Sequence, residues 1–405
     1  MARCSSTPLP NAPELPRILV LSGAVPETRF AGSLLLYRLL LKYPADRLYA
    51  MGVRTHPKSE LLECPYVHLP PARSARLNLT RFAKLKRSLE TMGVMGRIPA
   101  SRVDAALNGF TPDVVVSVME RRDYVDAAYR LCRRRGLPLV LLVHDRLESF
   151  ELVYPPFRAA QIAANARIYR FASARLCVSP EMVTSLAAVY GARGSVMYPN
   201  RSDALRARPA EEARELKGPP KLTLGYAGSL SYGYGDRLRE LMPDLASAGI
   251  ALRLYSHDVP TIPIDGAEHA GGFAADVLWE RVKRECDGVW LPYSNHEHFQ
   301  PLYRTHFPSK LTEYMALGMP VVITGPADAT GVKWGVAHPG ATLTLPDAGV
   351  TEIRDALDRL RRDGAARVSI AAASRGGDRD FDPETIRRQF ANVLHDVAAR
   401  RGSRR

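Results

Sequence analysis

The fold of this chain is indicated most clearly by one continuous stretch, Phe307-Pro-Ser-Lys-Leu-Thr-Glu-Tyr-Met-Ala-Leu-Gly-Met-Pro-Val-Val-Ile-Thr-Gly325. It predicts a short helix that leads directly into a strand. Pro308 suits the first helical turn, and Gly318 suits a left-handed helix stop. The apolar run at 321–323 is typical of a strand buried on both faces. The stretch therefore predicts an α/β unit of a parallel sheet.

Two charged residues lie near the start of the predicted helix. Lys310 and Glu313 are three apart and share one face, at the helix end where backbone N–H groups and the dipole favour a phosphate. One interpretation is a solvated surface ion pair. The other gives Lys310 a phosphate and Glu313 a pair of ribose hydroxyls. The spacing alone leaves both interpretations open.

A family resemblance favours the second interpretation. The pattern Pro-Ser-Lys-x-x-Glu-Tyr-Met-Ala-x-Gly-x-Pro-Val-Val resembles the nucleotide-sugar motif in the C-terminal domain of two-Rossmann-domain (GT-B) glycosyltransferases, especially retaining family-4-like enzymes. It implies a donor site that includes Pro308, Ser309, Lys310, Leu311 and Glu313. The family pattern also has a carboxylate eight residues before Glu313, which usually contacts the donor sugar. This chain has Thr305 there, so the sugar stays open.

The composition is that of a globular protein. With 405 residues, 46% of them hydrophobic, the chain is long enough for two domains. No apolar run approaches the roughly 20 residues of a membrane helix, and residues 1–16 lack a signal-peptide core. The five cysteines are scattered, which favours reduced thiols. We therefore expect a cytoplasmic protein.

Apolar strands alternate with helical patterns along the chain, as in an α/β fold of Rossmann-like domains. The resemblance implies that two such domains face each other across a cleft. The expected segments are an N-terminal acceptor-binding domain at 1–205, a linker at 206–220, a C-terminal nucleotide-sugar-binding domain at 221–380, and a helix with a basic tail at 381–405 that crosses back to the first domain.

Polar residues follow the predicted strands of the first domain. His144 and Asp145 come directly after the apolar run 137–143, and ligands of open α/β sheets bind beyond the carboxyl ends of strands. The pair could be catalytic or could cap the next element. The resembled enzymes have a His that faces the sugar at the end of a comparable strand, which favours a catalytic role. Gly32, at a helix start, could admit an acceptor or phosphate, or could simply form a tight turn.

Further donor-site candidates lie in the second domain. The strand at 222–227 runs into a glycine-containing loop, where the resembled enzymes often place a basic residue that grips the pyrophosphate. Positive groups there would stabilise the leaving phosphate. The candidates are Gly228 and Ser229 in the loop, Arg237 just after it, Tyr293 at a strand end where a base could rest, and Arg304.

The segment 73–103 is strongly basic, in a chain whose formal net charge is +14. Its basic residues are Arg73, Arg76, Arg81, Lys84, Lys86, Arg87, Arg97 and Arg102, against one acid, Glu90. Phe82, Leu85, Leu89 and Met92 recur at helical spacing. This pattern predicts a basic amphipathic helix that either lies on an anionic membrane or packs its apolar stripe on its own domain.

The leading function is a hexosyltransferase-like glycosyltransferase. It would move a sugar from a UDP- or GDP-linked donor to a glycan or lipid-linked glycan, with the retention that the resemblance implies, in the cytoplasm or peripherally on the inner membrane face. No other cofactor is expected, and no metal, because the histidines at 296–306 lack zinc-site spacing. The alternatives are a sugar-nucleotide epimerase on the same fold and a non-catalytic nucleotide- or anion-binding Rossmann protein. No nucleic-acid motif is present, so nucleic acid is not expected as a partner.

Overall fold

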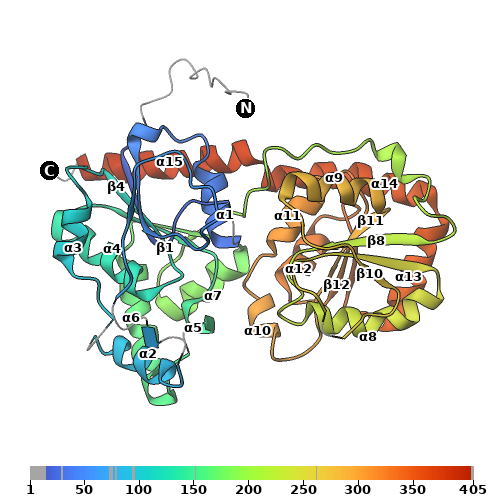
Figure 1. The fold of residues 1–405 in the computed structure, drawn as a ribbon, viewed down its shortest axis with the longest axis horizontal. Helices are drawn as coiled ribbons and strands as arrows, with labels where there is room; N and C mark the ends of the chain where they lie inside the picture. Colours follow the sequence, from blue (N-terminus) through green and yellow to red (C-terminus); the bar gives the residue numbers. More distant parts are fainter. Residues whose placement is uncertain are drawn as a thin grey trace.

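The computed structural model describes residues 15–28, 31–72, 76–77, 80–93, 96–150, 152–260 and 262–402. In these residues two parallel sheets lie side by side, and helices cover their faces (Figure 1). The predicted fold class, two Rossmann-like domains, is confirmed.

The first sheet has the order β3-β2-β1-β4-β5-β6-β7 in the described residues, and all its strands pair in parallel. Its strands are β1 (Ile18–Ala24), β2 (Leu48–Val53), β3 (Tyr66–His68), β4 (Val114–Val118), β5 (Leu139–Val143), β6 (Ala174–Cys177) and β7 (Ser195–Val196). The order reverses between β1 and β4, which is where such sheets bind ligands.

The helices of the first domain are α1 (Ala31–Leu40), α2 (Ala83–Thr91), α3 (Ala100–Ala106), α4 (Arg122–Arg135), α5 (Leu147–Phe150), α6 (Arg158–Phe171) and α7 (Pro180–Tyr190). Local signals explain where several of them end. Gly136 and Gly191 terminate α4 and α7 in the left-handed conformation, and Ser179 caps the start of α7 by accepting from the Met182 N–H.

The second sheet has the order β10-β9-β8-β11-β12-β13 in the described residues, also with parallel pairing. Its strands are β8 (Leu222–Ala227), β9 (Ile250–Tyr255), β10 (Ala267–His269), β11 (Gly288–Pro292), β12 (Val321–Gly325) and β13 (Leu343–Pro346). Its helices are α8 (Tyr234–Ser247), α9 (Ala275–Glu285), α10 (Gln300–Tyr303), α11 (Ser309–Met315), α12 (Thr330–Ala337), α13 (Val350–Arg362) and α14 (Gly364–Gly377).

The stretch from Phe307 to Gly325 forms α11 and β12. Leu311 and Met315 are fully buried, and every residue of β12 is buried. Gly318 has φ +65°, and a Cβ there would lie 2.5 Å from the Arg208 carbonyl oxygen, so both conformation and space require glycine. Pro308 differs from the expectation: it precedes the helix as the N-cap residue, and α11 begins at Ser309.

The last helix, α15 (Pro383–Gly402), runs along the first domain (Figure 1). Ile386, Phe390 and Leu394 of this helix are buried in one apolar cluster with β1 and β4 of the first sheet. The C-terminal end of the chain therefore ties the two domains together. Residues 403–405 of the basic tail lie outside the described residues.

The segment between the domains packs on the second one. Arg208 is buried, and its guanidinium donates to the carbonyl oxygens of Lys283, Cys286 and Asp287 at 3.0–3.3 Å. These contacts fasten the beginning of 206–220 to the end of α9.

In the described part of the segment 73–103, α2 forms at the predicted apolar stripe, and α3 begins at Ala100. The first basic residue of the segment, Arg73, lies outside the described residues. Lys86 and Ser88 face inward on α2, whereas Phe82, Leu85 and Met92 are 48%, 43% and 61% exposed. The interpretation that this stripe packs on its own domain is therefore wrong for these three residues. In the described residues no helix is long and apolar enough to span a membrane.

Candidate active site

His144 follows β5 at the carboxyl edge of the first sheet. Its Nδ1 is buried and has no hydrogen-bond partner among the described residues. Burial lowers the pKa of His144, although the neighbouring Asp145 carboxylate acts in the opposite direction. The ring is therefore neutral near pH 7, and the role of His144 toward the sugar stays a prediction.

Asp145 reaches across to the second domain. Its Oδ1 lies 2.7 Å from Nε2 of His306, and Nδ1 of the same ring lies 2.8 Å from the Leu302 carbonyl oxygen. Both ring nitrogens of His306 therefore face oxygen atoms. Burial alone would raise the pKa of Asp145, but the hydrogen bond and charge of His306 hold it below its usual range.

The segment 305–307 contacts the first domain on either side of this pair. The Thr305 carbonyl oxygen accepts a hydrogen bond of 2.7 Å from the Ser179 hydroxyl. The ring of Phe307 packs on that of Tyr198, with centroids 4.8 Å apart. The position where the resembled family has a carboxylate is thus buried against the first domain, and Thr305 takes part through its backbone.

Lys310 lies over the loop that follows β8. A Cβ on Gly228, whose φ is +122°, would be 2.5 Å from Cε of Lys310, so the glycine makes room for the side chain. The ammonium sits 4.2 Å from the ring centroid of Tyr234 and 5.2 Å from that of Tyr226. Burial lowers the pKa of Lys310 to about 8, against the opposing charge of Asp258. Among the described residues no carboxylate forms an ion pair with it, and its phosphate contact stays a prediction.

The same loop is shaped by Asp258. One oxygen of this carboxylate accepts from the Ser229 hydroxyl at 2.6 Å and from the Leu230 N–H at 2.9 Å. These hydrogen bonds, that of Ser229 first, hold the pKa of Asp258 below its usual range. The hydroxyl of Ser229 thus fixes the loop, and its donor role stays a prediction.

Glu313 lies in the contact between the domains. Its Oε1 is 2.5 Å from Nη1 of Arg38 on α1, and its Oε2 accepts from the Ser202 N–H at 3.3 Å. The two ionic side chains are only 7% and 10% exposed. Both carboxylate oxygens therefore face protein groups, and the predicted ribose contact requires Glu313 to exchange Arg38 or Ser202 for the nucleotide.

Arg237 and Arg304 differ in their freedom to meet a phosphate. Arg237 is buried and donates to Glu240 at 2.7 Å and to the Ala348 carbonyl oxygen at 3.5 Å. Its guanidinium is committed to these protein groups. Arg304 is half exposed and pairs with Asp328 through Nε, which leaves part of its fork at the surface.

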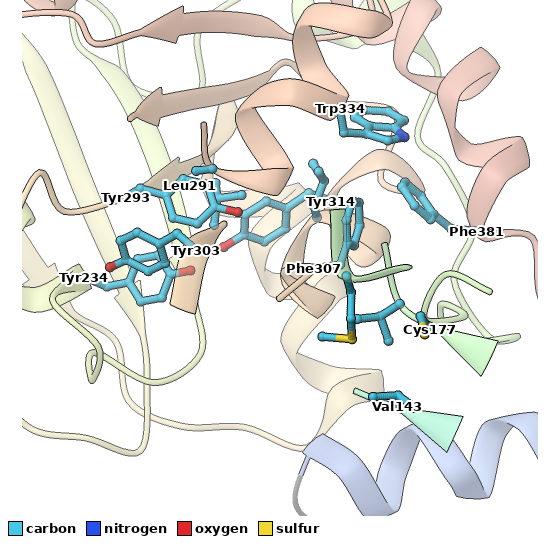
Figure 2. Packing of buried hydrophobic residues seen from close by; sticks show 14 of the residues in the cluster. Val143, Cys177, Tyr234, Leu291, Tyr293, Tyr303, Phe307, Tyr314, Trp334 and Phe381 are labelled. Carbon is cyan, nitrogen blue, oxygen red and sulfur yellow. The ribbon is translucent and has the colours of Figure 1, made fainter. Parts of the chain in front are cut away.

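Tyr293 is part of an aromatic cluster and is not an open platform for a base. Its ring lies 4.7 Å from that of Tyr303 and 5.9 Å from that of Tyr234, and Figure 2 shows the three rings packed together. Its hydroxyl accepts from the Gly331 N–H at 3.2 Å, and the residue is 1% exposed. Leu311 is likewise buried in the core. Tyr293 and Leu311 therefore pack inside the second domain and have no open surface for a nucleotide.

The expected glycine at the start of α1 faces a residue that the sequence did not single out. A Cβ on Gly32 would lie 3.6 Å from Oε2 of Glu120, which follows β4. Oε1 of Glu120 accepts from the Ala24 N–H at 2.5 Å and the Ser22 hydroxyl at 3.2 Å. Burial raises the pKa of Glu120 in spite of these hydrogen bonds.

Sequence reasoning did not single out Glu120, and it considered His306 only as a metal ligand with unsuitable spacing. Glu120 could have been found by its place two residues after a buried strand. His306 carried no such signal, because its partner Asp145 lies far away in the sequence and on the other domain.

Comparisons with known proteins indicate the class of this protein. Residues 38–200 match the family described as glycosyl transferase 4-like domain. The match covers most of the first domain. No curated protein matches the chain.

Solved structures share the two-domain arrangement. HepE from Anabaena, in complex with UDP, aligns with a TM-score of 0.64 at 15% identity, over 94% of this chain and 100% of its own. WaaG, a glycosyltransferase involved in lipopolysaccharide biosynthesis, gives 0.59 and 13% over 93% and 99%, and MurG from Acinetobacter baumannii gives 0.52 and 13% over 94% and 100%. At identities of 13–15%, the similarity to these solved structures shows the GT-B fold alone. The activity rests on the family match over residues 38–200. The chain is a glycosyltransferase.

Proposed function

We propose that this glycosyltransferase binds a UDP- or GDP-linked sugar on the second domain and transfers the sugar, with retention, to a glycan or lipid-linked glycan on the first. The observation that carries the proposal is the ammonium of Lys310, held over Gly228 beside β8 with no carboxylate partner among the described residues. A cation at this sheet edge suits the pyrophosphate of a nucleotide sugar. HepE, whose solved structures contain UDP and UDP-glucose, supports UDP as the first nucleotide to test.

The proposed phosphate contact and the proposed sugar contact lie at the edges of different sheets. Lys310 would hold the leaving phosphate, and its charge would stabilise the oxyanion as the glycosidic bond to phosphate breaks. His144, neutral and with a free buried Nδ1, would face the transferred sugar from the first domain. Asp145 and His306 bring these two edges together.

Thermal unfolding with UDP and with GDP tests donor binding. A nucleotide at a hundred times its dissociation constant should stabilise the parent protein by about 2.7 kcal/mol. The shift should largely disappear in Lys310→Gln and persist in Lys333→Gln, a control on an exposed lysine of the same domain. No shift with either nucleotide would contradict the donor assignment. NMR of the product's anomeric centre then tests retention.

We further propose that α2 contacts an anionic membrane surface, which would bring a lipid-linked acceptor to the enzyme. Leu85 on α2 and Phe82, the N-cap residue of that helix, are exposed. Tyr154 is also exposed and lies beside α2, where its N–H donates to the Ser88 hydroxyl at 3.0 Å. Lys84 lies 5.1 Å from the Tyr154 ring centroid. Apolar side chains with basic neighbours suit the boundary between head groups and acyl chains.

Vesicle flotation tests this contact. The parent should float with vesicles that contain phosphatidylglycerol. The bound fraction should fall as the salt concentration rises, because screening shortens the range of attraction between exposed charges to about 10 Å at 0.1 M. Phe82→Ser/Leu85→Ser should stay in the unbound fraction while its UDP affinity is unchanged. Binding that ignores lipid charge and salt would contradict the proposal.

A further inference from the structure

Tyr232 has a backbone conformation that tyrosine rarely adopts. Its φ is +59°, in the left-handed region. Among the described residues two other non-glycine residues have positive φ, and they are Asn108 and Asp347, residue types that tolerate this region. A bulky aromatic residue is strained there. Such strain persists where the surrounding structure imposes it, and it is concentrated at ligand sites, so Tyr232 is a candidate functional residue.

The loop that carries Tyr232 after β8 is fixed to the segment that follows β11. The Tyr232 carbonyl oxygen accepts a hydrogen bond from the Tyr303 hydroxyl. Gly233 has φ +81°, and a Cβ there would lie 2.6 Å from the Phe299 ring and 2.7 Å from Cβ of Ser294. These contacts place the loop beside the carboxyl ends of β8 and β11. The order of the second sheet reverses between these two strands, and open α/β sheets bind ligands at such a point.

The ring of Tyr232 is exposed, whereas the next aromatic residue of the loop is buried. Tyr232 is 49% exposed, and among the described residues no hydrogen bond, ion pair or ring contact involves its side chain. Tyr234 is 7% exposed, and its ring centroid lies 4.2 Å from the ammonium of Lys310, the proposed phosphate ligand. An exposed aromatic ring thus lies two residues from the tyrosine that contacts this cation.

Polar side chains are exposed in the segment that holds this loop. Residues 295–298, Asn-His-Glu-His, are all exposed and lie between the two residues that a Cβ on Gly233 would meet. The rings of His296 and His298 lie 5.9 Å and 5.1 Å from that of Phe299. Amide, imidazole and carboxylate groups can form hydrogen bonds with hydroxyls. An aromatic face near such groups suits a sugar, because a sugar ring has an apolar C–H face and hydroxyls at its edge.

We propose that the Tyr232 ring packs on the hexose of the nucleotide-sugar donor and helps to select that hexose. Glu313, the predicted ribose ligand, lies about one turn beyond Lys310 on α11 and faces Arg38 of the first domain. Lys310 instead faces the loop after β8. A nucleotide sugar has its ribose and its hexose on opposite sides of the pyrophosphate, so the hexose lies on the side of Tyr232. The inference rests on the proposed function and adds a specificity residue to it.

Calorimetry with UDP-glucose, UDP-galactose, UDP-N-acetylglucosamine and GDP-mannose, each compared with its free nucleoside diphosphate, tests this contact. For the nucleotide sugar that binds the parent most tightly, Tyr232→Gly should raise the dissociation constant about three- to tenfold, as expected for the loss of an aromatic contact. The dissociation constant of the free diphosphate should stay unchanged. Tyr232→Phe should bind both ligands like the parent, because the ring is kept.

Stability separates this role from a structural one. Glycine adopts positive φ without steric cost, so Tyr232→Gly should have a denaturation midpoint equal to or above that of the parent. Asn108→Gly makes the same backbone change at an exposed position between α3 and β4, and it should leave every nucleotide affinity unchanged. A clearly lower midpoint for Tyr232→Gly would show that the ring serves the fold, and it would overturn the proposal.

Equal affinity of Tyr232→Gly and the parent for the nucleotide sugar would also overturn the proposal. So would an equal loss for the free diphosphate, because the ring would then stack on the base. Failure of the proposed function is distinguishable from both results, since the parent itself would then bind none of these nucleotides. If the parent binds them and Tyr232→Gly binds the nucleotide sugar equally well, the hexose contact alone fails.

Discussion

His306 of the second domain and Asp145 of the first lie 2.7 Å apart, Nε2 to Oδ1, and this pair joins the end of β5 to the segment before α11. It sits beside Thr305, the position where the resembled family has a carboxylate. The charged groups that face each other at this point thus come from two domains. Turnover should depend on the pair as a unit.

We expect Asp145→Asn and His306→Gln each to lower kcat/KM, and the double variant to be little worse than either, because each single change already breaks the pair. Coupling energies between such contacting residues are about 0.5–3 kcal/mol. His338→Gln is the control, since His338 forms a comparable pair with Asp380, 3.3 Å away, within the second domain. Strictly additive losses in the double-mutant cycle would show that Asp145 and His306 act separately.

The pKa of Lys310 predicts how nucleotide affinity depends on pH. Burial lowers this pKa to about 8, so the ammonium is present below that pH and is lost above it. The dissociation constant for UDP should therefore rise between pH 7 and pH 10, at a slope approaching tenfold per pH unit. Lys310→Arg should flatten the rise, because the guanidinium stays charged throughout. A parent profile that is flat over this range would exclude the ammonium from phosphate binding.

The buried pair of Arg38 and Glu313 predicts a stability effect that the sequence did not suggest. Glu313→Gln or Arg38→Gln leaves one buried charge unpaired, which typically costs about 3–5 kcal/mol of unfolding free energy. Arg38→Met/Glu313→Met should recover most of this loss, measured by denaturant unfolding. Nucleotide affinity then separates the two roles: a ribose contact requires that Glu313→Gln weaken UDP binding and that Arg38→Gln spare it.

Gly318→Ala should destabilise the protein more than Gly340→Ala. Both glycines have positive φ, +65° and +83°, so both changes strain the backbone. Only at position 318 would the new Cβ meet another backbone atom, the Arg208 carbonyl oxygen at 2.5 Å. We expect a loss of about 1–2 kcal/mol beyond that of the control, read from the denaturation midpoint. Equal midpoints would mean that 206–220 moves aside freely.

The local chemistry of the sequence determined the α/β character of this protein. Val321 to Ile323 form a buried strand because a parallel sheet covered on both faces needs apolar side chains on both. Gly318 ends its helix in the left-handed region, and Leu311 with Met315 faces the core, as their spacing indicated. His144 follows β5 at the sheet edge, as the apolar run before it indicated.

The sequence was less informative where exposure depends on neighbours. The stripe of Phe82, Leu85 and Met92 has the spacing of a buried helix face, yet α2 turns Lys86 and Ser88 inward. Tyr293 ends a strand as expected, but the packing of Tyr234 and Tyr303 buries it. Spacing reports which residues share a face of a helix or strand, and it does not report what covers that face.

Only the tertiary structure decided which residues meet between the domains. Glu313 carries the spacing of a helix-face carboxylate, but its partner Arg38 comes from another domain. The same holds for Asp145 and His306, and for Ser179 with Thr305. Residues more than a hundred positions apart can come into contact only when two sheets and the returning helix α15 set the domains against each other. That long-range geometry leaves no periodic trace in the sequence.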